Sequence, residues 1–333
     1  FYPPDPASLD SCSLGGNVAE NAGGPRAFKY GVTREYVLGL DLTLMGGRPM
    51  RVGRRTAKGV TGFDLVGLMV GSEGTLAVIS EIVLKLIPRP QGVATFLAQF
   101  PEPLSASRAV TAMVARGHQP RTLELLDNHV VEHLRASGSY AIPAEAGALL
   151  LVELDGPAEA LEQQLLDAAG VCDDGGAVDI LVATDEARRR QMWEMRRNAN
   201  PALKERHRFK VSEDVVVPRA AIPEMVRRLD QLAAQHDVLI ATFGHAGDGN
   251  LHVNVLYDDE AVGARLDPVL EGIFRHALEL GGTLSGEHGI GISKQRFMPL
   301  EQPPELIQLQ RDLKRALDPH DLMNPGKLFP PVG

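Results

Sequence analysis

The chain has 333 residues, more than one ordinary hydrophobic core accommodates, so two domains are expected. Its formal net charge of −9 argues against nucleic acid or an anionic membrane surface as a partner. No apolar run approaches the roughly 18 residues that a membrane-spanning helix needs. The two cysteines, Cys12 and Cys172, lie far apart, which favours a reducing compartment over a disulfide-stabilised protein.

Residues 11–90 are expected to form a first block of strands joined by turns. Hydrophobic spacing and turn residues predict strands at Tyr36–Leu44, from Met50 and at Leu76–Ile87, a turn at Gly46–Pro49, and helical spacing at Phe63–Val70. Two segments of small residues, Ser11–Pro25 and Gly71–Thr75, are predicted to be loops. Glycines in such loops let backbone amides approach a ligand closely, although a glycine-rich loop alone is weak evidence for a site.

From Val93 onward, predicted strands and helices alternate. The strands are Val93–Phe100, Thr122–Leu126, Ala148–Asp155, Val178–Ala183 and Phe209–Val217. The helices are Leu104–Val114, Asp127–Ala136, Ala158–Ala169, Asp185–Leu203, one opened by Pro223, Ala264–Leu280 and Glu305–Leu317. Because the connecting loops are uneven in length, an antiparallel sheet with helices on one face fits at least as well as a parallel sheet.

The segment Leu239–Tyr257, LIATFGHAGDGNLHVNVLY, is predicted to be a β-hairpin around which a site is built. Its Asp-Gly and Gly-Asn pairs supply the backbone freedom that a tight turn requires. The turn would bring His245 close to His252, and alternation places His252 and Asn254 on one face of the strand. A stray histidine in a glycine-rich turn is the alternative interpretation.

A second cluster of ligand-type residues follows in GGTLSGEHGIGI, at 281–292, where Glu287 and His288 stand among glycines. If this loop folds over the hairpin, His245, His252 and Glu287 form a set of two imidazoles and one carboxylate. Such a set suits Zn²⁺ or Mn²⁺ and leaves coordination positions open for substrate.

The predicted helix Asp185–Leu203 combines core and polar positions. Its methionines and alanines make an apolar stripe that we assign to the core: Met192, Met195, Ala199 and Ala202. Trp193, Arg196 and Asn200 share an adjacent face. A solvated face is the plain interpretation of its arginines, and an arginine turned inward to hold a carboxylate is the sharper one. Lys210 on the following strand is either such a group or a surface charge.

Two stretches of the first block resemble a known family. GGNVAENAGGPRAFKYGVT and GFDLVGLMVGSEGTLAVISEIVLKLIPRP are similar to the second half of the FAD-binding domain of vanillyl-alcohol oxidase-type flavoproteins. The closer resemblance is to FAD-linked D-2-hydroxyacid dehydrogenases, which include D-lactate dehydrogenases and the FAD subunit of glycolate oxidase. It implies an α+β fold with three parts: a partial FAD-binding domain (1–90), an antiparallel-sheet substrate domain (91–310) and a tail returning to the flavin (311–333).

The same resemblance assigns roles to individual residues. In this family GHAGDGNLH and GEHGIG mark the catalytic centre, which makes His245, His252 and Glu287 metal ligands and His288 the catalytic base. Asn254, Arg196 and Lys210 would contact the substrate. FAD would be lined by Gly15, Gly16, Asn17, Ala19, Asn21, Ala22, Gly23, Gly71, Glu73, Gly74, Thr75 and Asn324.

The implied reaction is metal-assisted oxidation of a D-2-hydroxy acid, such as D-lactate or glycolate, to the 2-oxo acid. Hydride would pass to flavin N5, and the electrons would go on to a non-oxygen acceptor: a quinone, a cytochrome, a flavoprotein or an iron–sulfur subunit. A cytoplasmic location, peripheral to the inner membrane through a partner, fits this role. The oligomeric state is open, with a homodimer as one candidate.

The family's glycine-rich pyrophosphate loop would precede Phe1, where a family member would have on the order of a hundred more residues. We therefore expect the 333-residue chain alone to bind FAD weakly or not at all. A metal-dependent hydrolase could use the same ligands with a bound water, but it would not need the first block. An inactive fragment is the other alternative. A nicotinamide enzyme is disfavoured because no strand–GxGxxG–helix unit occurs.

Overall fold

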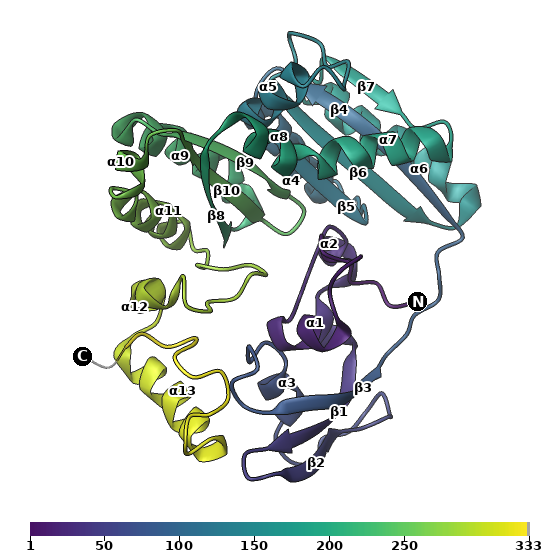
Figure 1. The fold of residues 1–333 in the computed structure, drawn as a ribbon. Helices are drawn as coiled ribbons and strands as arrows, with labels where there is room; N and C mark the ends of the chain where they lie inside the picture. Colours follow the sequence, from purple (N-terminus) through teal and green to yellow (C-terminus); the bar gives the residue numbers. More distant parts are fainter. Residues whose placement is uncertain (332–333) are drawn as a thin grey trace. The chain divides into compact units, whose positions relative to one another are not determined.

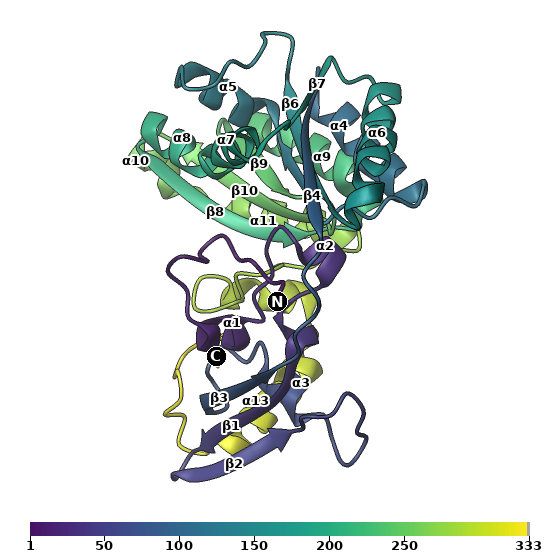
Figure 2. The same ribbon diagram turned by 90° about the vertical axis from the view of Figure 1, so that its right-hand side faces the viewer.

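The computed structural model describes residues 1–331 and divides into two compact units. The first unit comprises Phe1–Arg89 and the described residues from Leu284 onward, and the second comprises Pro90–Thr283. Figures 1 and 2 show the elements of both units from two directions. The compact units divide the chain after Arg89 and after Thr283. The sequence-based division after residues 90 and 310 stays a proposal.

The first unit is built on a three-stranded antiparallel sheet in the order β2-β1-β3, with β1 at Val37–Leu44, β2 at Arg48–Gly53 and β3 at Val78–Leu84. Its helical segments are α1 (Leu14–Glu20), α2 (Ala27–Tyr30), η1 (Thr33–Tyr36), α3 (Leu65–Met69), η3 (Gln295–Phe297), α12 (Met298–Glu301) and α13 (Pro304–Leu317). Val18 of α1, Val66 of α3 and Leu40 of β1 pack in one core, so α1 and α3 are both fixed to the sheet.

Helix α1 lies where the sequence predicted a loop. The side chain of Ser13 caps its start by accepting a hydrogen bond from the Gly16 amide. Asn21 ends it in the left-handed region with φ 55°. A helical glycine costs about 1 kcal/mol relative to alanine, but both ends of this helix are capped and Val18 is fully buried. The glycine content alone was therefore misleading.

The second unit contains a seven-stranded sheet in the order β7-β4-β6-β5-β9-β10-β8, and every pair of neighbours is antiparallel. The strands are β4 (Gly92–Phe100), β5 (Thr122–Leu126), β6 (Ala148–Gly156), β7 (Asp179–Val182), β8 (Phe209–Val216), β9 (Leu239–His245) and β10 (Asn250–Tyr257). This arrangement confirms the expected α+β class with an antiparallel sheet.

Helices cover both faces of this sheet, whereas the sequence predicted helices on one face. One layer holds α4 (Pro103–Ala115), α6 (Ala158–Asp174), α9 (Ile222–His236) and α11 (Asp267–Glu279), and the other holds α5 (Asn128–Ala136), α7 (Glu186–Arg197) and α8 (Ala199–Arg206) (Figure 2). Short segments η2 (Arg219–Ala221) and α10 (Glu260–Gly263) complete the unit. The burial of β5 agrees with this arrangement, because every residue of the strand is buried instead of alternating with exposed positions.

The single helix predicted over Asp185–Leu203 is two helices that meet at Asn198. Pro201 explains the break, since it lacks an amide hydrogen and its ring clashes with the carbonyl of residue 197 in a continuous helix. Asp185 is the N-cap of α7 and accepts from the Arg188 amide at 2.9 Å. The expected apolar stripe of this segment is buried. Because of the break, Arg196 belongs to α7 and Asn200 to α8.

Within residues 1–331, no helix combines the length and the apolar character that crossing a bilayer requires.

Candidate functional site

The predicted hairpin is formed by β9 and β10, and its register sets the histidines. Asn250 pairs with His245, and His252 pairs with Phe243. The two histidines are therefore diagonal neighbours on one face of the sheet. Their ring centroids lie 5.2 Å apart, and the ring planes are nearly perpendicular at 87°. The predicted approach of the two histidines is confirmed.

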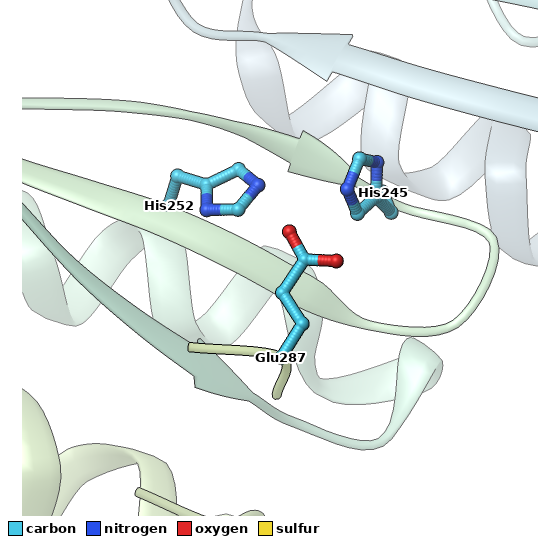
Figure 3. Close-up of side chains that lie close together, drawn as sticks. All are labelled: His245, His252 and Glu287. Carbon is cyan, nitrogen blue, oxygen red and sulfur yellow. The ribbon is translucent and has the colours of Figure 1, made fainter. Parts of the chain in front are cut away.

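Glu287 completes a cluster with these histidines. One ligand atom from each of His245, His252 and Glu287 lies within 4.8 Å of the other two, and Figure 3 shows the carboxylate directed toward both rings. The local chain path explains the approach: Thr283, four residues earlier, is bridged to Val216 of β8, and four residues span at most about 14 Å.

A buried carboxylate supports the cluster from behind. Glu124 of β5 has no exposed surface. Its Oε1 lies 2.6 Å from Nδ1 of His245, and its Oε2 accepts from Nε of Arg196 at 2.6 Å. Burial alone would raise the pKa of Glu124, but the charges and hydrogen bonds of His245 and Arg196 outweigh it and hold the pKa below its ordinary value. The guanidinium of Arg196 also lies over the Phe243 ring, 4.7 Å from its centroid.

Lys210 and Asn254 form a second polar group beside His252. The Lys210 ammonium donates to Ser212 Oγ at 2.7 Å and to Asn254 Oδ1 at 2.8 Å, and it also bonds Asn200. The Asn254 amide donates to the carbonyl of His252 at 3.0 Å. Burial, and secondly the charge of Lys204, lower the pKa of Lys210 to about 8. The cationic donor on β8 therefore contacts Asn254, which lies two residues along β10 from the candidate ligand His252.

In the first unit, hydrogen bonds join the two small-residue segments. The Gly71 amide donates to Val18 at 2.9 Å, and the Glu73 amide donates to Ala19 at 2.8 Å. From the C-terminal tail, the Asn324 side chain donates to the Glu73 carbonyl at 2.6 Å. Three stretches that are remote in sequence thus lie together at the end of α1.

The same place holds the GEHGIG loop. The Glu73 carboxylate accepts from the amides of Ile290 at 2.8 Å and Gly291 at 2.7 Å. A Cβ added at Gly23 would lie 3.3 Å from Oε2 of Glu287, so this glycine leaves room for the ligand carboxylate. Burial, and secondly the negative charge of Glu73, raise the pKa of Glu20 to about 7.

Comparison with known proteins gives these two groups of residues a common context. The sequence model described as "FAD linked oxidases, C-terminal domain" matches residues 89–328, and the model described as "FAD binding domain" matches residues 1–53. This chain belongs to the FAD-linked oxidase family.

The relatives of this FAD-linked oxidase include oxidoreductases of 2-hydroxy acids. The chain is 41% identical to "Glycolate oxidase subunit GlcD" of Bacillus subtilis (strain 168), covering 99% of this chain and 70% of the relative. It is 35% identical to "D-lactate dehydrogenase" of Anaerostipes hadrus, covering 98% of this chain and 71% of the relative. A solved alkyldihydroxyacetonephosphate synthase superposes with a TM-score of 0.70 at 18% identity, over 98% of this chain and 60% of that one, which shows the fold.

The residues of this FAD-linked oxidase fit a flavin and a divalent metal by different criteria. The chemistry of the donor atoms fits a divalent metal, since two imidazoles and one carboxylate converge. The segments predicted to line FAD leave space for a ligand. A Cβ added at Gly15 would meet no atom within 4 Å, so the first turn of α1 is open. The Glu73 side chain, predicted to line FAD, accepts from the amides of residues 290 and 291.

The other predicted residues are placed as follows. Arg196 directs Nε and Nη2 to Glu124, so these donors already have a protein acceptor. His288 is exposed in the loop that carries Glu287. Glu124 was not identified from the sequence. Its signal was a charged residue inside an otherwise apolar buried strand, TLELL, which requires a paired environment.

Proposed function

We propose that this FAD-linked oxidase supplies the substrate-oxidising centre for converting a D-2-hydroxy acid to its 2-oxo acid, with Zn²⁺ or Mn²⁺ at His245, His252 and Glu287. The observation that carries the proposal is the convergence of these three side chains next to the cationic Lys210–Asn254 pair. A 2-hydroxy acid presents a hydroxyl and a carboxylate on adjacent carbons, so it requires an acidifying centre and a cation within a few ångströms.

The absent groups would supply two kinds of chemistry. A divalent cation held by the three ligands would supply Lewis acidity, and FAD, when bound, would accept a hydride. The chain would hold FAD through the segments around Gly15–Gly23 and Gly71–Thr75, with Asn324 beside them.

Positioning and proton transfer fall to the chain's own side chains. Lys210 is the cationic donor for the substrate carboxylate, and Asn254 fixes its position through the 2.8 Å hydrogen bond. Arg196 adds positive charge behind His245. His288 would accept the hydroxyl proton, a role for which an imidazole suits neutral pH. The hydroxy acid would be a small one of the glycolate or D-lactate class, and the electrons would leave to an acceptor other than oxygen.

Metal removal is the first experiment. The purified chain should bind Zn²⁺ or Mn²⁺ at one ion per chain by calorimetry after treatment with a chelator, and His252→Ala should lose this binding. His118→Ala, which alters a histidine in the loop after α4, is the matched control and should bind normally. Equal metal binding by His252→Ala and the unaltered chain would show that the ligand set is wrong.

The second experiment tests the reaction. With FAD and metal supplied, the chain in its full protein context should reduce a dye acceptor with D-lactate or glycolate, and not with L-lactate. His288→Ala should lower turnover by about 10²–10⁴-fold if His288 is the base, while metal binding stays unchanged. Turnover that is unaffected by this substitution would remove His288 from the mechanism.

A further inference from the structure

The buried carboxylate of Glu124 has a different donor on each of its two oxygens. Oε1 lies 2.6 Å from Nδ1 of His245. Oε2 lies 2.6 Å from both Nε and Nη2 of Arg196. Glu124 has no exposed surface and His245 is 3% exposed, so water does not compete for these bonds.

This geometry determines where the proton of His245 resides. An ionised carboxylate only accepts hydrogen bonds, so Nδ1 of His245 must be the donor. A neutral imidazole with its proton on Nδ1 carries its lone pair on Nε2. Metal-ligating histidines in proteins commonly donate their second nitrogen to a carboxylate in this manner.

We infer that Glu124 is a positioning residue, which fixes His245 as the Nδ1–H tautomer, presents Nε2 to a divalent metal and fastens Arg196 to the same centre. The inference rests on the proposed metal role of His245. It adds a residue from β5 to a site whose other parts come from the hairpin and the Glu287 loop.

The requirement is specific for a carboxylate because two donors face one side chain. Glutamine offers a single carbonyl oxygen. If that oxygen stays with Arg196, the glutamine NH₂ faces Nδ1 of His245 and favours the Nε2–H tautomer, which cannot bind metal through Nε2. If the oxygen turns to His245, the NH₂ faces the Arg196 guanidinium, donor against donor.

Glu153 of β6 provides a matched control in the same sheet. It is 1% exposed and binds cations as Glu124 does: its Oε1 lies 2.6 Å from Arg121, and its Oε2 lies 3.1 Å from Arg189 and 2.9 Å from Trp193 Nε1. Its partners include no histidine of the cluster. Loss of its charge should disturb the packing of α7 on the sheet to a similar degree without altering a metal ligand.

The experiment measures Zn²⁺ dissociation constants of the 333-residue chain by competition with a chromophoric chelator. Glu124→Gln should weaken Zn²⁺ binding by about 10–100-fold, while Glu153→Gln should change it less than about twofold. In the double variant Glu124→Gln/Arg196→Met, the glutamine carbonyl is released to accept from His245, and Zn²⁺ affinity should recover by about tenfold or more. A purely structural role would make the double variant weaker still.

A spectroscopic measurement on the unaltered chain needs no variant to fold. Long-range ¹H–¹⁵N correlation of the metal-free, ¹⁵N-histidine-labelled chain should show His245 as the Nδ1–H tautomer, assigned by its loss in His245→Gln. Finding the Nε2–H tautomer would overturn the inference, as would unchanged Zn²⁺ affinity in Glu124→Gln or the absence of recovery in the double variant. No Zn²⁺ binding by the unaltered chain would instead overturn the proposed metal function, and this inference with it.

Discussion

Side chains of the candidate site are held by protein partners, and these partners influence the charge of the side chains. Lys210 has three oxygen acceptors around its ammonium group, from Asn200, Ser212 and Asn254. These groups are polar but uncharged, so they do not offset the cost of burial, and the pKa falls to about 8. A carboxylate substrate would supply the missing negative charge.

The pH dependence of anion binding follows from this pKa. Only the charged form of Lys210 attracts a carboxylate, so affinity for oxalate in the metal-loaded chain should be flat below pH 8. Above about pH 8 it should fall by up to tenfold per pH unit, because a proton must be taken up for binding. Calorimetry between pH 6.5 and 9.5 measures this profile.

Lys210→Arg is the control for that profile. A guanidinium stays charged throughout the range, so this variant should bind oxalate more weakly, since its geometry differs, yet without the decline above pH 8. The same decline in both proteins would assign the effect to another group.

At the level of elements, the β8–β10–β9 ladder determines the geometry of the hairpin. β10 pairs with β8 and with β9 without a register shift. Gly249, which has φ 88°, closes the turn next to β8, and its carbonyl accepts from the Val217 amide at 3.1 Å. A Cβ at position 249 would lie 2.0 Å from the Val217 carbonyl oxygen, so the turn tolerates only glycine there.

Gly249→Ala should therefore lower the free energy of unfolding of the second unit through both a strained φ and steric overlap with Val217. Gly176→Ala is the control, since Gly176 has φ 85° and open space around its Cβ position in the same unit. Each substitution adds roughly 1–2 kcal/mol of left-handed strain, and Gly249→Ala adds about 1–3 kcal/mol of overlap. Urea unfolding measures both, and equal losses would contradict this account.

The elements also show what local sequence determines. The hairpin was predictable because apolar alternation and turn residues lie within twenty positions of one another. The end of α7 could have been read from Pro201. The capped helix α1 required weighing Ser13 and Asn21 against two glycines.

Glu124 could not have been assigned to His245, because 121 residues separate them and only strand order makes them neighbours. The cluster of His245, His252 and Glu287 could be proposed from the sequence because each of its two motifs contains several ligand-type residues within a short segment.

For the whole molecule, the metal content tests whether residues remote in sequence form one ligand set. The chain spans 70% of the Bacillus glycolate oxidase subunit that it resembles. One ligand atom from each of His245, His252 and Glu287 lies within 4.8 Å of the other two. We expect the 333-residue polypeptide to retain Zn²⁺ at one ion per chain. Metal analysis of the purified chain tests this, and a metal content far below one ion per chain would refute it.

The strand order has a consequence for how the site comes into being. Pairing of β5 with β9 joins the β7-β4-β6-β5 part of the sheet to the β9-β10-β8 part. Glu124 and His245 are directly paired across that seam, whose closure is a slow, long-range step because the intervening chain must first be ordered. Neither part of the sheet contains both members of the pair. A nascent chain or a folding intermediate with the seam open would therefore carry the histidines without the Glu124 carboxylate beside them, so any metal bound there should be held more weakly until the sheet is complete.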